Sequence, residues 1–73
     1  MNETPLNHVS LPEIGERLRV AREAANLTQK DAAEAIAVAR TTLVAIEQGQ
    51  RRVRMDELQQ LAKLYKTSVN ALL

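Results

Sequence analysis

The sequence predicts an all-α protein, a compact bundle of five short helices in one domain, from three observations. Apolar residues recur three and four positions apart after residue 9, and no stretch has the pattern of a strand. Ser10, Thr28 and Ser68 each precede such a helical pattern, as capping residues do. The chain has 73 residues and no cysteine, so helix packing alone must hold one small core.

The first helix is expected to start after Ser10, because Ser10 and Glu13 have the spacing of a capping box and Pro12 is tolerated in a first turn. Asn26 suits a left-handed residue at its end. The predicted buried stripe consists of Ile14, Leu18, Ala21 and Ala25. Residues 1–9 have no periodicity and are interpreted as a flexible tail, which makes 10–73 the domain.

A second helix is expected after Thr28, with Asp31 completing its cap and Ala32, Ala33 and Ile36 facing inward. Only residues 37–39 separate it from the next apolar set. Because so short a connection makes two helices cross sharply, helices 2 and 3 are predicted to form a helix-turn-helix. On a helical wheel, the third helix, 40–48, buries Leu43, Ile46 and Glu47.

The remaining chain is predicted to form a basic loop, 50–54, and two more helices. The fourth helix begins at about Met55, and Ser68 caps a short fifth one. The stripe of the fourth helix consists of Leu58, Leu61, Ala62 and Tyr65. The last apolar residues either close the core or form a dimer seam; they are Val69, Leu72 and Leu73.

Charge is distributed unevenly along the chain. The net charge is only +1, but residues 1–39 sum to −2 and residues 40–54 to +3. The positive block therefore begins with the third predicted helix and extends through the loop after it.

Several classes of function are disfavoured. No apolar run approaches the ~20 residues of a membrane span, and no signal peptide is visible, so we expect a cytoplasmic protein without a membrane partner. The single histidine, His8, lies in the N-terminal tail, and the acidic residues are dispersed. We therefore expect no enzyme, no metal site and no cofactor.

A set of motifs resembles one known family, the lambda-repressor-like (Xre/Cro-type) helix-turn-helix DNA-binding domains. The resemblance runs from about residue 14 to residue 73. It is carried by Leu27-Thr28-Gln29, Ala33, Ile46-Glu47, Gly49, Leu58, Leu61 and Ala62. It implies sequence-specific binding of double-stranded DNA by a transcriptional regulator, expected to be a repressor, with helix 40–48 in the major groove.

The chain departs from the family at four positions. Ala37 and Lys66 stand where glycine is common, Val53 where proline is common, and Ala39 where Ser or Thr often caps the third helix. The turn at Ala37 is therefore expected to be either strained or different in its backbone.

The wheel and the resemblance together give candidate site residues. Expected contacts to bases are Arg40, Thr41, Val44 and Ala45. Expected contacts to phosphates are Gln29, Gln48, Arg51, Arg52 and Arg54. The resemblance also implies a partly buried Arg22–Glu47 salt bridge that fixes the third helix on the first. The alternatives are an ordinary exposed valine, a glutamine that only fills a cap, and arginines on a merely solvated face.

Three alternatives concern partners. The same fold can serve as a helical protein–protein interaction module, in which Val44, Ala45 and the arginines would meet an acidic protein. The chain can also be the N-terminal DNA-binding part of a larger multidomain regulator, with a fused domain or further protein partner. If it acts alone on DNA, we expect a homodimer on a (pseudo)palindromic operator whose half-sites lie about one helical turn apart.

Overall fold

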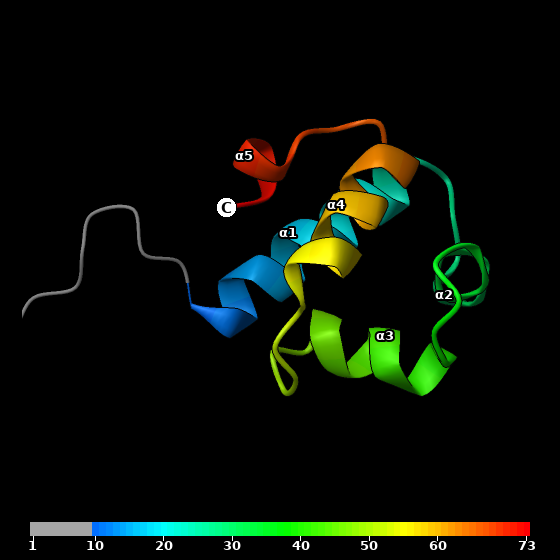
Figure 1. Cartoon of the computed structure of the whole chain (residues 1–73), viewed down its shortest axis with the longest axis horizontal. Helices are drawn as coiled ribbons and strands as arrows, with labels where there is room; N and C mark the ends of the chain where they lie inside the picture. Colours follow the sequence, from blue (N-terminus) through cyan, green and yellow to red (C-terminus); the bar gives the residue numbers. More distant parts are fainter. Residues whose placement is uncertain (1–9) are drawn as a thin grey trace, which may run out of the picture.

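A computed structural model describes residues 10–73, and all regular structure in this part of the chain is helical. The helices are α1 (Leu11–Ala24), α2 (Gln29–Ala35), α3 (Arg40–Glu47), α4 (Met55–Leu64) and α5 (Val69–Leu72), shown in Figure 1. The predicted all-α bundle of five short helices is confirmed. The tail predicted for residues 1–9, including His8, lies outside the described residues.

Side-chain caps start three of the helices where the sequence predicts them. The Ser10 hydroxyl accepts from the backbone N–H of Glu13 at 3.3 Å, and the Glu13 carboxylate accepts from the Ser10 N–H at 3.0 Å. Thr28 and Asp31 form the same reciprocal pair, and Ser68 caps α5. Each cap satisfies backbone N–H groups that a helix cannot pair internally.

The α2–α3 turn settles the question raised by its missing glycine. Ala37 has a φ of 59°, so the backbone is left-handed, as it would be for glycine, and the alanine carries the strain. That conformation costs a residue with a Cβ about 1 kcal/mol or more. Asn26 and Lys66 adopt the same region with φ values of 60° and 59°. Ala39 stands at the N-cap of α3 and makes no side-chain hydrogen bond there.

The core contains the apolar stripes that helical spacing predicts, and its largest fully buried side chains are Leu18, Leu43, Ile46 and Leu61. Leu72 is also buried and closes the core, whereas Leu73 is 40% exposed and Val69 is partly buried. The last apolar segment therefore divides: Leu72 belongs to the core, and only its neighbours remain available to a partner.

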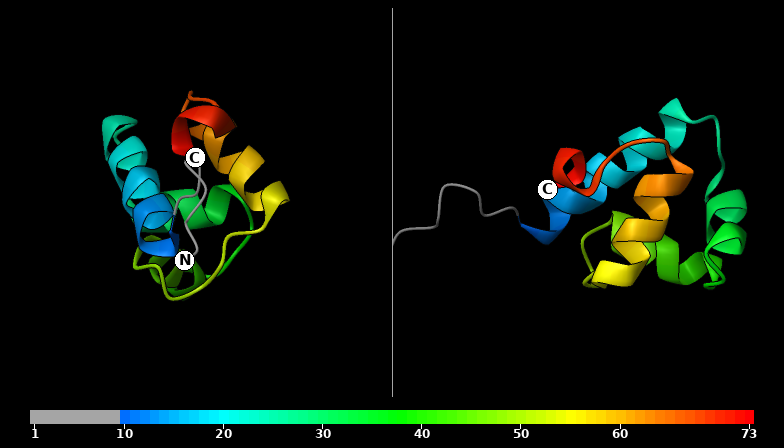
Figure 2. Two further views of the ribbon diagram at one scale, coloured as in Figure 1. Left: turned by 90° about the vertical axis from the view of Figure 1, so that its left-hand side faces the viewer. Right: turned by 45° about the horizontal axis from the view of Figure 1, so that its top comes forward.

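The helices place α3 at one edge of the bundle. It packs on α1 and α2, while α5 packs on α1 and α4. In Figure 1 α3 runs along the lower edge of the bundle, and both views of Figure 2 show α5 on the opposite side. One face of α3 is thereby buried while the other is left uncovered by the rest of the described chain.

Candidate nucleic-acid interface

The orientation of α3 follows from its amphipathic pattern. Leu43, Ile46 and Glu47 are buried, as the helical wheel predicts. On the other side, Arg40, Thr41 and Gln48 are exposed, and the small side chains Val44 and Ala45 are half-buried. This outward face carries mostly short side chains and has a cation only at its N-terminal end, so another molecule can approach the backbone of α3 closely.

Gly15 makes the close crossing of α1 and α3 possible, a role that the apolar periodicity of the sequence does not predict. A Cβ at this position would lie 2.4 Å from the carbonyl oxygen of Glu47 and 2.5 Å from that of Ile46. Any side chain would therefore push α3 away from α1. The only sequence signal is a glycine inside a helical apolar stripe, where it lowers helix propensity and suggests a packing reason.

Arg22 of α1 and Glu47 of α3 form an ion pair, the contact implied by the resemblance. The Arg22 Nε and Nη2 atoms donate to the two Glu47 carboxylate oxygens at 2.7 and 3.2 Å, and Arg22 also donates to the Leu27 carbonyl at 2.9 Å. The side chains are only 9% and 3% exposed. The carboxylate beside it raises the pKa of Arg22 above its usual value. This bidentate pair fixes the rotation of α3 about its own axis.

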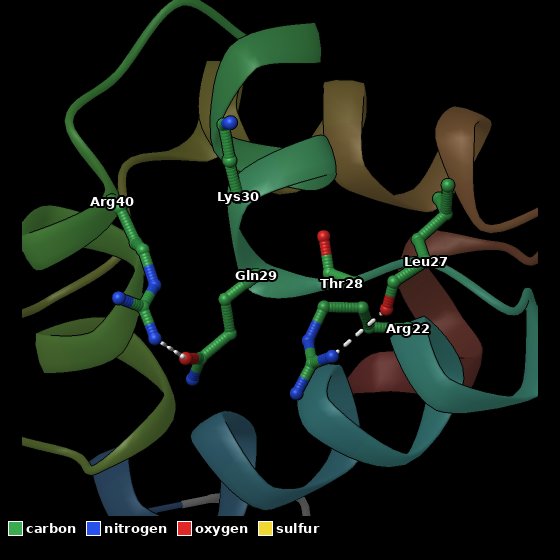
Figure 3. A pocket seen from close by; sticks show the side chains of 6 residues that line it. All are labelled: Arg22, Leu27, Thr28, Gln29, Lys30 and Arg40. Atoms are coloured by element: carbon green, nitrogen blue, oxygen red, sulfur yellow. Dashed lines mark hydrogen bonds between the residues drawn. The ribbon is translucent and has the colours of Figure 1, made fainter.

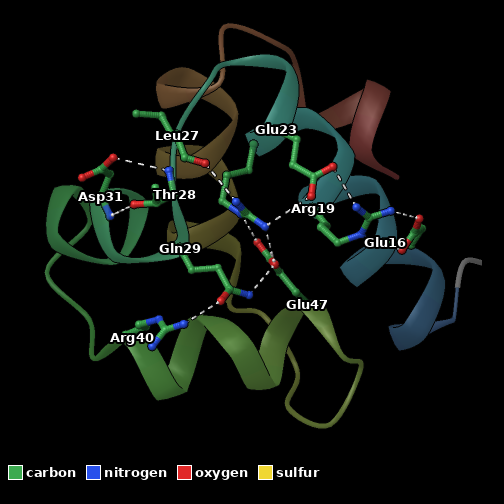
Figure 4. A network of polar contacts seen from close by, with 10 residues as sticks. Glu16, Arg19, Glu23, Leu27, Thr28, Gln29, Asp31, Arg40 and Glu47 are labelled. Atoms are coloured by element: carbon green, nitrogen blue, oxygen red, sulfur yellow. Dashed lines mark hydrogen bonds and ion pairs between the residues drawn. The ribbon is translucent and has the colours of Figure 1, made fainter.

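Gln29 extends this pair to the surface, as Figure 4 shows. Its amide nitrogen donates to Glu47 at 3.0 Å, and its carbonyl oxygen accepts from Arg40 at 3.5 Å, a loose contact. Because a carboxylate only accepts hydrogen bonds, Glu47 requires the nitrogen of Gln29 to point inward. The second hydrogen of that nitrogen remains available to another acceptor. A polar chain thus links buried Arg22 to exposed Arg40.

A shallow hollow lies where α2 begins beside α3, and Figure 3 shows the side chains around it. It is lined by Arg22, Leu27, Thr28, Gln29, Lys30 and Arg40. Lys30 and Arg40 are exposed and the hollow has no acidic lining residue. Its polar groups therefore favour an anion, such as a phosphate, next to the outward face of α3.

The three arginines of the 50–54 loop occupy different environments, which the basic run in the sequence does not reveal. Arg51 is half-buried and makes a bidentate pair with Glu57 at 3.0 and 3.1 Å. Arg54 is exposed and pairs with Asp56 at 2.9 Å. Arg52 is exposed, and within residues 10–73 its guanidinium has no hydrogen-bond or ion-pair partner. The positive block is therefore partly neutralised by its neighbours.

Neither a membrane span nor a metal cluster is found in the part of the chain that the structure describes. None of its helices has the length and apolar character needed to cross a bilayer. None of its acidic side chains gather in a group of three or more that could hold a metal ion.

The architecture defines the class of protein, a small helical domain in which α2 and α3 form a helix-turn-helix and one face of α3 is uncovered. A family model described as a helix-turn-helix domain matches residues 13–73, so the chain belongs to that family. The predicted resemblance to Xre/Cro-type domains is confirmed, and membership identifies the chain as a DNA-binding regulatory domain.

Solved structures agree with this assignment. The restriction-modification controller protein C.AhdI from Aeromonas hydrophila is 30% identical with a TM-score of 0.80, over 86% of this chain and 96% of that one. The clp gene regulator ClgR from C. glutamicum is 27% identical with a TM-score of 0.78, over 93% and 90%. Apo-HppE, 23% identical with a TM-score of 0.79 over 88% of this chain and 36% of that one, shares the fold. A search of curated proteins found no match.

Proposed function

We propose that the chain binds a specific double-stranded DNA sequence by placing α3 in the major groove, and that it regulates transcription as a repressor. The observation that carries this proposal is the outward face of α3. Its side chains are mostly short and half of them are apolar, and Arg40 lies at its N-terminal end. The buried hydrogen bonds from Arg22 to Glu47 hold the helix rigidly. A rigid helix whose exposed face has short side chains is suited to reading base edges in a groove about 12 Å wide.

The outward side chains have distinct roles in this proposal. Arg40 donates to a guanine at O6 and N7, a pairing that is worth about 1–3 kcal/mol of discrimination. Thr41 offers a hydroxyl and a methyl group. Val44 and Ala45 pack on thymine methyl groups, which their half-buried positions on α3 allow.

The phosphate contacts are proposed to surround this face. Gln29 uses the second hydrogen of its amide nitrogen, next to the hollow beside Lys30. Gln48, Arg52 and Arg54 lie at the end of α3 and in the loop after it, where all three are exposed. Arg54 can exchange Asp56 for a phosphate because their ion pair is exposed and water screens it. Arg51, by contrast, is already paired with Glu57.

We further propose a cytoplasmic homodimer, acting through regulation rather than catalysis. One α3 covers only one half-site, so two copies on a palindromic operator, about one helical turn apart, supply the specificity. The exposed apolar side chain of Leu73, with part of Val69, is available to such a contact.

A second arrangement is favoured by one comparison. The described fold occupies only 36% of the Apo-HppE chain, so this fold also occurs within longer proteins. In that arrangement the chain is the DNA-binding part of a larger regulator, and the mass of the native protein distinguishes the two.

Selection from a pool of random DNA duplexes tests the proposal. The wild type is expected to enrich one motif, and Arg40→Ala is expected to lose the preference at one base pair. Lys63→Ala, an exposed cation on α4, is the matched control and should keep the motif. If the wild type enriches no motif, sequence-specific binding is wrong, and the helical protein–protein interaction module becomes the better interpretation.

A further inference from the structure

Glu57 is the third residue of α4 and is buried. Arg54 stands at the N-cap position, and its side chain is turned to Asp56 instead of the helix end. The Glu57 carboxylate accepts the backbone N–H of Arg54 at 2.9 Å, and Glu57 is only 5% exposed. This buried acid therefore makes the N3 half of a capping box, as Glu13 and Asp31 do in α1 and α2, while no hydroxyl makes the other half.

Arg51 completes the arrangement from the other side of the loop. Its two terminal nitrogens donate to the two Glu57 oxygens at 3.0 and 3.1 Å, and Nη1 also donates to the backbone carbonyl of Arg52 at 3.0 Å. The bonds to Arg51 hold the pKa of Glu57 below its usual value. The Arg51 guanidinium thus joins the first turn of α4 to the backbone of Arg52, the residue whose own guanidinium has no partner within residues 10–73.

We infer that Arg51 is a positioning residue that, with Glu57, orders the loop so that Arg52 meets the DNA backbone. Arg51 itself makes no phosphate contact. Three of the five N–H donors of Arg51 bind a buried carboxylate and a carbonyl, and a phosphate could recruit these three only by leaving Glu57 without its ion pair in a buried site. Arg52 carries an uncommitted guanidinium on a segment whose backbone is held from within. This inference rests on the proposed DNA binding and goes beyond it by giving the two arginines different roles: Arg51 orders the loop, and Arg52 contacts the DNA backbone.

The first test compares Arg51→Lys with Arg51→Ala, using the duplex selected by the wild type as the probe. A lysine keeps the charge and can meet a phosphate, but it cannot reproduce a fork bound to both oxygens of Glu57 and to a carbonyl. Positioning therefore predicts that both variants lose affinity equally, about threefold to tenfold for one lost phosphate contact. Arg51→Lys binding like the wild type would overturn the inference.

The second test is a double-mutant cycle between Arg51→Ala and Arg52→Ala, measured as affinity against salt concentration. If Arg51 acts through Arg52, its replacement has no further effect once Arg52 is absent, and the salt slope of the double variant falls by about 1 in total. Additive losses with a slope reduced by about 2 would show two separate phosphate contacts, and the inference would be wrong.

Glu57→Gln should change the affinity for DNA in opposite directions, depending on whether Arg51 contacts a phosphate or only positions the loop. Removing a negative charge beside DNA and freeing Arg51 should strengthen binding if Arg51 contacts phosphate. Under positioning, the same change weakens binding because the loop loses its anchor. Circular dichroism below the unfolding transition confirms which variants are folded, and the cycle with Arg52 uses only partly or fully exposed positions. A wild type that binds no duplex would refute the proposed function, whereas normal binding with additive losses refutes only this inference.

Discussion

Two arginine–glutamate pairs, one at the C-terminal end of α3 and one between the following loop and α4, differ in how deeply they are buried. Arg22 and Glu47 are 9% and 3% exposed and join α1 to α3, whereas Arg51 and Glu57 are 34% and 6% exposed and join a loop to α4. In both, the carboxylate is the buried partner, but only the first guanidinium is buried with it. When an arginine is removed, water reaches the remaining carboxylate more easily if that arginine was partly exposed. The cost of breaking the pair should therefore be larger for Arg22 than for Arg51.

The largest effect is expected from breaking the deeper pair. Arg22→Met keeps much of the apolar stem but leaves the Glu47 carboxylate without its guanidinium, so the free energy of unfolding should fall by about 3–5 kcal/mol. Urea denaturation measures this loss. Arg19→Met is the control, because Arg19 pairs with Glu16 and Glu23 on the surface of α1, where water screens the charges, and its loss should be much smaller. A loss below 1 kcal/mol for Arg22→Met would contradict the structural role of the pair.

A smaller loss is expected at the second pair. Arg51→Met should lower the free energy of unfolding by about 1–3 kcal/mol, because Glu57 keeps the Arg54 N–H and gains access to water through the loop. The same denaturation experiment checks this value. Arg52→Met is the matched control, since its guanidinium has no partner within residues 10–73 and its loss should be near zero. An equal or larger loss than for Arg22→Met would reverse the comparison.

Acid should weaken the second pair in a predictable window. The Arg51 hydrogen bonds lower the pKa of Glu57 below its usual value of 4.5. The stabilisation is therefore present above that value and is lost as pH falls through the lower pKa of the folded state. The difference in unfolding free energy between the wild type and Glu57→Gln should shrink from about pH 5 downward, and thermal melts across this range measure it. A difference independent of pH would show that the Glu57 charge contributes nothing.

The smallest effect concerns a hydroxyl in the field of the deeper pair. The Tyr65 hydroxyl is buried without a hydrogen-bond partner among residues 10–73, and burial raises the pKa of Tyr65 to about 12. Tyr65→Phe removes an unpaired polar group at nearly constant shape, so stability should stay unchanged or rise by about 1 kcal/mol. Chemical denaturation checks this. Destabilisation by more than 1 kcal/mol would mean that the hydroxyl stabilises the Arg22–Glu47 charges.

Most of the fold could be predicted because its signals are local. The capping boxes at Ser10 and Thr28 and the 3.6-residue apolar periodicity each depend on residues within one or two turns of one another. The basic loop could not be interpreted in the same way. Whether Arg51 faces DNA or Glu57 depends on where α4 begins relative to the loop, and a run of like charges does not encode that.

The sequence by itself determined the five helices, their inward faces and the helix-turn-helix family, because propensity, capping and periodicity act over short distances. Only the tertiary structure decided that α1 can cross α3 at Gly15, that Gln29 points its nitrogen toward Glu47, and that one loop arginine of three is free. These features arise from close approach and hydrogen-bond competition between segments distant in the chain or separated by a turn. Composition supplies the charged residues, but packing decides which acidic side chain each arginine pairs with.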